Sequence, residues 1–99
     1  MSKLVWTIPA VSDLDAIYDF IANDSEYYAC SFIEELIQQP EKLLKFPEMG
    51  RIVPEYNCKD IRELIFQSYR IIYQITDKSI LILAVIHGKR DILSTYDEI

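Results

Sequence analysis

Apolar residues near the start of the chain follow two different periods. The segment from Lys3 to Ile8 is short and β-branched, contains the only tryptophan and is followed by Pro9, so it predicts a β-strand. Beyond the proline, apolar residues recur every three or four positions, which is typical of a helix with one buried face. Ser12 and Asp15 resemble a capping box, and we therefore expect this helix to begin near Ser12.

A polar break at Asn23-Asp24-Ser25 ends this pattern and begins a second helix. The apolar positions of the second helix are Ala29, Phe32, Ile33, Leu36 and Ile37, with Leu43 and Leu44 extending the same spacing. Pro40 removes one backbone donor, which predicts a kink or a restart between Gln38 and Glu41. Because the break between the two helices is short, we expect them to form a helical hairpin.

The second half of the chain predicts a small antiparallel sheet. Three β-rich runs cover residues 61–66, 69–76 and 79–87, and short polar connections separate them. Such connections join neighbouring antiparallel strands. If Gln67-Ser68 is a two-residue loop, Phe66 pairs with Tyr69 and Ile65 with Arg70. Together with the N-terminal strand, these elements predict an α+β fold of order β-α-α-β-β-β, in which the helical hairpin packs on the sheet.

This register divides the side chains of the sheet between two faces. The face expected to pack against the helices carries Leu64, Phe66, Tyr69, Ile71, Tyr73, Ile75, Ile80, Ile82, Ala84 and Ile86. The opposite face carries Glu63, Ile65, Arg70, Ile72, Gln74, Leu81, Leu83, Val85 and His87. Because five aliphatic residues surround an arginine there, this face is too apolar for an ordinary wet surface. We expect either the C-terminal segment or a partner protein to cover it.

Length and composition indicate a single domain, residues 1–99, with an uneven distribution of charge. The formal net charge of −6 disfavours nonspecific attraction to nucleic acid or to anionic membranes. Nine acidic and three basic residues precede position 49, whereas seven of each follow it, and all the arginines lie in the second half. The longest apolar run is far shorter than the roughly 20 residues that cross a bilayer. With no secretory signal visible, we expect a cytoplasmic protein without membrane contact.

The chain lacks the short motifs that identify most enzyme classes, including a phosphate-binding glycine loop, a nucleophile elbow and metal ligands at helical spacing. Cys30 and Cys58 are interpreted as free, largely buried thiols, with a disulfide or a metal site as the alternative. We expect no metal and no cofactor. His87 is interpreted as a strand-end histidine bonded to the backbone. A solvated helix face is the simplest interpretation of three acidic residues, Asp13, Asp15 and Asp19.

Several short segments of the sequence are each common in proteins, but their order and spacing together are specific enough to indicate a family. They are Trp6 in the first strand, Asp13-Leu14 and Ile17 in the first helix, Phe46-Pro47-Glu48-Met49-Gly50-Arg51 with Val53-Pro54-Glu55, Arg62-Glu63-Leu64, Tyr69-Arg70-Ile71-Ile72-Tyr73, and residues 82–91. Together they resemble the RelE/ParE superfamily, the toxins of bacterial type II toxin–antitoxin pairs, often described as plasmid stabilisation proteins. The resemblance covers the whole chain and implies the same hairpin-on-sheet fold.

The superfamily contains RelE-like nucleases, which cut mRNA on the ribosome, and ParE-like inhibitors of DNA gyrase. The resemblance matches Arg70, Arg90 and Tyr96 to catalytic positions of the nucleases, where arginines stabilise phosphorane charge and a tyrosine transfers a proton. The positions that carry lysines in those nucleases hold Ile61 and Glu63 here. Glu63 is expected diagonal to Arg70 on the same face, where a carboxylate would repel phosphate and could pair with the guanidinium.

ParE-like members need no catalytic constellation, and the Phe-Pro-x-x-Gly-Arg, Arg-Glu-Leu and His-Gly-x-Arg-Asp segments resemble them more closely. We therefore expect a toxin that inhibits DNA gyrase and is neutralised by a cognate antitoxin, alone, as a homodimer or in a hetero-oligomer with that antitoxin. Cleavage of mRNA on the ribosome and a non-toxic interaction domain are the alternatives. A purely structural pairing of Arg62 or Arg70 with Glu63 or Glu55 is equally compatible with the sequence. The candidate residues for binding the target or the antitoxin are Arg51, Arg62, Ile65, Arg70, Ile72, Leu83, Val85, His87 and Arg90.

Overall fold

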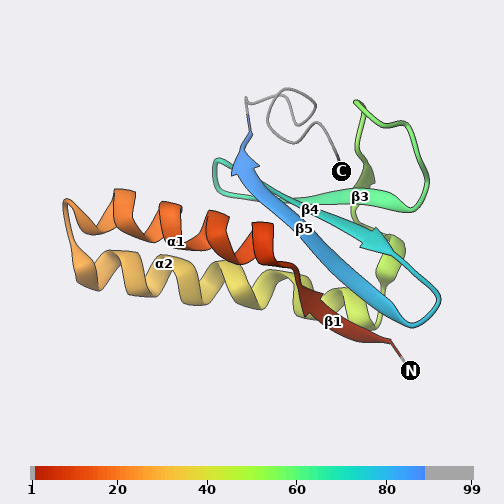
Figure 1. The fold of residues 1–99 in the computed structure, drawn as a ribbon, viewed down its shortest axis with the longest axis horizontal. Coiled ribbons are helices and arrows are strands. Elements are labelled where there is room, and N and C mark those ends of the chain that lie inside the picture. The colour runs from red at the N-terminus through yellow and green to blue at the C-terminus, as the bar shows by residue number, and fades with distance from the viewer. Residues whose placement is uncertain (1, 89–99) are drawn as a thin grey trace.

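The computed structural model describes residues 2–88, and its secondary structure has the predicted α+β order (Figure 1). The elements are strand β1 (Lys3–Trp6), helix α1 (Ile8–Ala22), helix α2 (Glu26–Gln38), the 3₁₀ helices η1 (Gln39–Leu44) and η2 (Pro47–Met49), and strands β2 (Arg51–Ile52), β3 (Ile61–Phe66), β4 (Tyr69–Ile75) and β5 (Ser79–His87). Figure 1 shows α1 and α2 side by side as a hairpin whose turn projects away from the sheet. Within the described residues, no helix is long and apolar enough to span a membrane.

The sheet has five strands in the order β1-β5-β4-β3-β2. Strands β3, β4 and β5 pair as antiparallel neighbours, as predicted, and the two-residue loop Gln67-Ser68 sets the expected pairing of Phe66 with Tyr69. The short strand β2, which was not predicted, adds an antiparallel partner to β3. Strand β1 joins the far edge parallel to β5, which makes the sheet mixed. A parallel pair needs a long connection between its strands, and the helical hairpin together with β2 to β4 supplies that connection.

The first helix begins earlier than the capping pattern predicted. Its N-cap is Thr7, whose Oγ1 accepts a hydrogen bond from the Ala10 N–H and donates one to the Ile82 carbonyl at 2.6 Å. Pro9 therefore lies in the first helical turn, where a missing backbone donor costs nothing, and the predicted start near Ser12 is wrong. The second helix begins as predicted, because the Ser25 side chain accepts a hydrogen bond from the Tyr28 N–H.

The predicted interruption at Pro40 is confirmed. Helix α2 ends at Gln38, and the chain continues as the 3₁₀ helix η1, in which Pro40 occupies one of the first two positions. Both Pro40 and Leu43 are buried there, so the restart keeps the chain packed against the sheet. The proline thus changes the helix type without ending the helical path.

A β-bulge in β5 exchanges the two faces of the sheet beyond Ile82. Tyr73 pairs with Ile82, but the preceding residue of β4, Ile72, pairs with Ala84, so Leu83 is an extra residue in the ladder. Beyond the bulge, Val85 belongs to the core against the helices, whereas two other residues of β5 belong to the opposite side, Ala84 and Ile86. The predicted faces of Ala84, Val85 and Ile86 are therefore wrong, because strict alternation fails where one strand gains a residue.

Each face of the sheet has its own hydrophobic core. The larger core lies between the sheet and the helices, and includes Leu14, Phe32, Leu36 and Tyr73. The smaller core lies on the opposite face around Ile72. It is closed by residues 53–60, the connection between β2 and β3 that we call the strap, through the fully buried Val53 and the partly buried Tyr56. The chain itself therefore covers part of the face for which we expected the C-terminal segment or a partner.

Tyr73 connects the larger core to the turn before β2. Its hydroxyl donates to the Pro47 carbonyl at 2.7 Å and accepts from the Gly50 N–H at 3.0 Å. Burial raises the pKa of this phenol, with the Gly50 hydrogen bond acting in the opposite direction. A Cβ at Gly50 would lie 2.6 Å from both the Glu63 carbonyl oxygen and the Tyr73 hydroxyl. The glycine of the Phe-Pro-x-x-Gly-Arg segment is therefore needed for close approach, since its φ of −75° is open to any residue.

Replacing Gly50 by alanine should destabilise the fold by about 1–3 kcal/mol, because the added methyl overpacks a site bounded by backbone and a buried ring. Gly88→Ala is the matched control, since its Cβ would be 3.1 Å from the Ser68 oxygen and otherwise clear of close contacts. Urea denaturation of both variants measures the difference. An equal loss of unfolding free energy in the two variants would contradict the conclusion that Gly50 is needed for close approach.

Candidate functional site

Three of the predicted functional arginines lie on neighbouring strands of the sheet. Arg51 is in β2, Arg62 in β3 and Arg70 in β4. Arg90 and Tyr96, the remaining candidates for a nuclease reaction, lie outside the described residues. The three described arginines differ in the face they occupy and in their partners.

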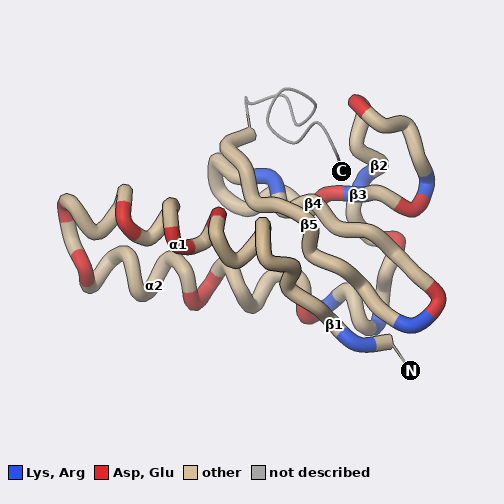
Figure 2. The backbone as a smooth tube through the Cα atoms, viewed as in Figure 1, with Lys and Arg blue, Asp and Glu red and all other residues tan. Residues whose placement is uncertain are grey.

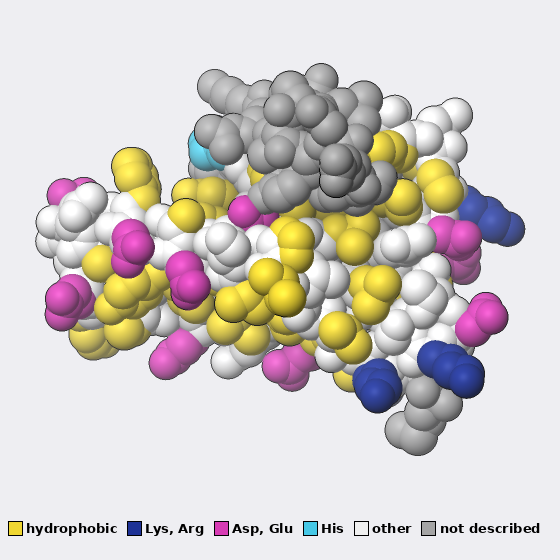
Figure 3. All heavy atoms as spheres, in the orientation of Figure 1, with side chains coloured by type: hydrophobic (Ala, Val, Ile, Leu, Met, Phe, Trp, Pro, Cys, Tyr) yellow, Lys and Arg dark blue, Asp and Glu magenta, His cyan; other side chains and the backbone are white. Residues whose placement is uncertain are grey.

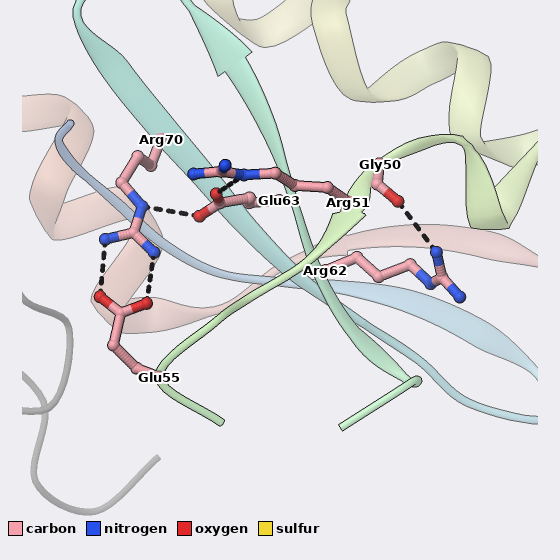
Figure 4. A network of polar contacts seen from close by, with 6 residues as sticks. All are labelled: Gly50, Arg51, Glu55, Arg62, Glu63 and Arg70. Atoms are coloured by element: carbon pink, nitrogen blue, oxygen red, sulfur yellow. Dashed lines mark hydrogen bonds and ion pairs between the residues drawn. The ribbon is translucent and has the colours of Figure 1, made fainter. Parts of the chain in front are cut away.

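Arg70 is the centre of a buried network of ion pairs (Figure 4). Its Nε donates to Glu63 Oε1 at 2.6 Å, while its two terminal nitrogens donate to the two carboxylate oxygens of Glu55 at 2.9 and 2.8 Å. Glu63 Oε2 in turn accepts from Nε of Arg51. Arg70 is only 5% exposed and Glu63 only 1%. Two guanidiniums and two carboxylates therefore share one cluster, which is buried at Arg70 and Glu63 and which we call the Arg70 cluster.

Strand register explains how the sequence assembles the Arg70 cluster. Arg51 lies directly opposite Glu63 in the β2–β3 ladder, and Ile65 lies opposite Arg70 in the β3–β4 ladder. Glu63 is therefore diagonal to Arg70 on one face, within reach of long side chains, as predicted. Glu55 comes from the strap, whose backbone brings its carboxylate over the same face.

The two hydrogen bonds that Arg70 donates to Glu55 are the largest cause of the raised pKa of Arg70, and burial acts against them. A buried guanidinium is tolerated only where carboxylates satisfy its donors and balance its charge. Here both edges of the guanidinium hold carboxylate oxygens. The predicted pairing of Arg70 with Glu63 or Glu55 is confirmed, since Arg70 donates to both carboxylates.

Arg62 occupies the other face of β3 and does not join the Arg70 cluster. Its NH1 donates to the carbonyls of Gly50 and Glu48 at 3.0 and 3.2 Å, and its Nε donates to the Lys59 carbonyl at 2.8 Å. A longer ion pair of 3.7 Å joins it to the Glu48 carboxylate. Figure 4 shows Arg62 directed away from Arg70 and toward Gly50. These bonds tie the turn before β2 to β3, so Arg62 has a structural role, whereas its role in binding stays a prediction.

The aliphatic candidates do not form one open surface. Ile72 is fully buried in the smaller core, where Leu83 is partly buried, and Val85 is buried against the helices. Ile65 alone among the four is classed as exposed. The strap and the bulge together account for this result: the strap covers Ile72, and the bulge turns Val85 to the other face.

His87 lies at the exposed end of β5, beside a pocket of about 210 Å³ between α1 and that strand end. Its ring meets the Tyr69 ring edge-on, with the centroids 5.8 Å apart. Asp13, Phe20 and Val85 also line the pocket. The bulge places His87 opposite Tyr69 on the helix side of the sheet and not beside Arg70, so its predicted face is wrong.

Asp13 is a polar residue whose structural role the sequence did not indicate. Asp13 Oδ2 accepts the Val85 N–H at 2.9 Å, so this residue is not simply part of a solvated helix face. Strand β5 has 9 residues and its edge partner β1 only 4, which leaves Val85 beyond the paired part of that edge. Because β1 ends before Val85, no strand among the described residues accepts the Val85 N–H at that edge, and the Asp13 side chain accepts it instead.

The cysteines are both free: Cys30 is exposed, contrary to prediction, and Cys58 is partly buried. Among residues 2–88, no group of three or more His, Cys, Asp or Glu side chains is placed to hold a metal ion. Within this part of the chain, the Arg70 cluster is the main concentration of buried charge.

Replacing Glu63 by glutamine should destabilise the protein by about 3–5 kcal/mol, because two guanidiniums lose the carboxylate between them. Glu48→Gln is the control, since it removes a carboxylate whose side chain is 75% exposed, and should change stability by less than about 1 kcal/mol. Chemical denaturation of both variants provides the comparison. A Glu63→Gln variant as stable as the control would show that the network contributes little.

Comparisons with known proteins agree with the architecture. A family model described as the ParE toxin of type II toxin–antitoxin system, parDE, matches residues 4–92. Toxin RelE2 of Caulobacter vibrioides (strain ATCC 19089 / CIP 103742 / CB 15) is 32% identical over 91 residues, which cover 91% of this chain and 99% of the relative. A solved structure of the chromosomal ParDE TA system from P. aeruginosa superposes with a TM-score of 0.76 at 25% identity, covering 90% of this chain and 98% of that one. The chain therefore belongs to the ParE toxin family of type II toxin–antitoxin systems.

Proposed function

We propose that this toxin acts by binding and inhibiting DNA gyrase and that it does not cleave RNA. The observation that carries the proposal is the state of Arg70. This arginine matches a catalytic position of the RelE-like nucleases, yet Glu55 and Glu63 hold its donors and it is 5% exposed.

A ribonuclease must stabilise the extra negative charge that develops on the phosphate as the 2′-hydroxyl attacks. Preorganised cationic donors aimed at that charge supply most of this stabilisation. In the Arg70 cluster the same donors face carboxylates, and Glu63 stands where the nucleases carry a lysine. An entering phosphate would meet two negative charges and would have to displace one of them.

Gyrase inhibition needs only a binding surface, because the toxin then acts as a ligand of another enzyme. The family supports this target, since gyrase inhibition is the activity that a ParE resemblance implies. Arg51, which is 63% exposed at the edge of the sheet, is the described arginine most accessible to such a partner.

With purified components, the toxin should block supercoiling of relaxed plasmid by DNA gyrase and leave ribosome-bound mRNA at full length. Arg51→Ala should weaken gyrase inhibition about tenfold, the size of effect typical for an exposed interface arginine. Lys78→Ala, which removes a positive charge from the β4–β5 turn, is the control and should inhibit like the parent. Full supercoiling accompanied by cleavage of mRNA would contradict the proposal.

We infer that the cognate antitoxin, a partner that the family implies, covers the turn end of the helical hairpin. Three large side chains are strongly exposed there: Phe20 at 73%, Tyr27 at 84% and Tyr28 at 56%. Acidic residues are distributed along both helices, whereas Lys and Arg lie toward the sheet end of the molecule (Figure 2). Figure 3 shows hydrophobic side chains between the acidic side chains of the helical hairpin. An antitoxin segment with apolar anchors and basic flanks complements this surface.

Replacing Tyr27 by serine should weaken antitoxin binding at least tenfold, since a truncated aromatic anchor typically loses more than about 1.4 kcal/mol. Phe46→Ser is the matched control, because Phe46 is 61% exposed but lies at the opposite end, before η2. Calorimetric titration of the antitoxin into each folded variant measures the two affinities. If only Phe46→Ser weakened the complex, the hairpin would not be the antitoxin surface.

A further inference from the structure

We propose that a second copy of this chain packs antiparallel against α2 and η1, so that the hairpin turn of each copy contacts the η1–η2 end of the other. The residues that form this surface do not belong to the Arg70 cluster. Self-association is measured without gyrase and without an antitoxin, so this inference stands apart from the proposed function.

Large apolar side chains are exposed at both ends of the path that α2 and η1 follow (Figure 1). Tyr27 and Tyr28 are both exposed and lie in the first turn of α2. Leu44, Phe46 and Met49 are exposed at the other end, around η1 and η2. Apolar side chains gathered in this way indicate a surface that binds another protein.

The η1–η2 end is hollowed as well as apolar. Its groove of about 410 Å³ is lined by Lys45, Phe46, Pro47, Glu48 and Met49. An aromatic side chain that enters this groove would contact the Phe46 ring and the Met49 thioether, and both are favourable partners for a ring. The groove therefore suits an exposed tyrosine of the kind that the hairpin turn carries.

Backbone hydrogen bonds hold this end of the molecule in one shape. The Phe46 N–H donates to the Lys42 carbonyl at 3.0 Å, and the Phe46 carbonyl accepts the Met49 N–H at 3.1 Å. The Pro47 carbonyl accepts from the hydroxyl of the buried Tyr73 at 2.7 Å. A preformed groove lowers the entropy that is lost on binding, so Phe46 is presented as an interface anchor.

The charges of the two ends select an antiparallel arrangement. Residues 8–38 hold seven acidic residues and no lysine or arginine, whereas residues 39–52 hold three basic and two acidic residues. Glu26 begins α2 beside the exposed tyrosines, Lys45 lines the groove, and both side chains are exposed. Parallel packing of two copies would bring their acidic ends together. Antiparallel packing places each acidic end against the more basic end of the other copy.

An antiparallel pair of identical chains has a two-fold axis and makes each contact twice. Tyr27 of one copy enters the groove beside Phe46 of the second copy, and Glu26 lies near Lys45 of the second copy. Because both ends of each copy are then occupied, the assembly closes at two chains. The two complementary surfaces belong to one sequence, so the described residues themselves specify the partner.

This pairing has a consequence for the antitoxin, because Tyr27 is also the anchor inferred above for antitoxin binding. A copy that is paired through Tyr27 cannot hold an antitoxin segment at the same residue. Self-association and neutralisation therefore compete. Substitutions in the groove free Tyr27 and leave antitoxin binding at least as tight as in the parent.

Sedimentation equilibrium of the purified full-length protein at low salt tests the pairing. We expect a monomer–dimer equilibrium without larger species. Phe46→Ser should raise the dissociation constant at least about tenfold, since it removes an aromatic anchor from both contacts. Ile65→Ser is the matched control, because Ile65 is 58% exposed but lies opposite Arg70 on β3, and it should pair like the parent.

A charge exchange tests the antiparallel geometry. Glu26→Lys alone, and Lys45→Glu alone, place like charges at both contacts of a homodimer, so each variant should self-associate about tenfold more weakly than the parent. An equimolar mixture of the two variants has opposite charges at both contacts and should pair about as tightly as the parent. A fluorescent label on one variant reports the mixed pair. All the substituted side chains are exposed, so circular dichroism should show the parental fold in each variant.

Three results would overturn the proposal. The first is a parent protein that stays monomeric, or that forms species larger than a dimer. The second is an equal dissociation constant for Phe46→Ser and Ile65→Ser. The third is a mixture of the two charge variants that pairs no more tightly than either variant alone, because the acidic and basic ends would then not face each other.

Discussion

The face of the sheet that carries Arg70 depends on one constraint. A guanidinium that is buried against a sheet needs carboxylates to accept its hydrogen bonds and to balance its charge. Arg70 is placed by its strand in a dry position, and Glu63 across the ladder satisfies one edge. The other edge requires a group from outside the sheet, which Glu55 supplies. The strap is therefore held over the smaller core by an electrostatic requirement as well as by the burial of Val53.

That constraint also bears on the chemistry of the superfamily. Proteins of one fold differ in activity through the groups placed at a shared site. Arg70, which the resemblance matches to a catalytic position of the nucleases, lies here between two carboxylates. One of these carboxylates, Glu55, ties the strap to β4. Retention of a residue type at a matched position is thus weak support for an activity unless the partners of its side chain are known.

The helical hairpin and the sheet divide the molecule into parts of different character. The hairpin turn carries acidic residues and exposed aromatic rings, and it projects beyond the sheet (Figures 1 and 3). The three described arginines lie on the sheet, where Arg62 and Arg70 donate to groups of the chain itself. Tyr73 joins the two parts from within, because its ring packs in the helix-facing core and its hydroxyl holds the turn that leads into β2.

Local patterns in the sequence determined the elements, the hairpin, the Gln67-Ser68 turn and the diagonal placement of Glu63 and Arg70, because each depends on residues close together or on a single ladder. The family also followed from segments read in order along the chain. The position of Glu55, the bulge at Leu83 and the bond from Val85 to Asp13 were decided only by the tertiary structure. These features arise where distant segments must satisfy each other's unpaired charges and backbone groups, and hydrophobic periodicity carries no information about such needs.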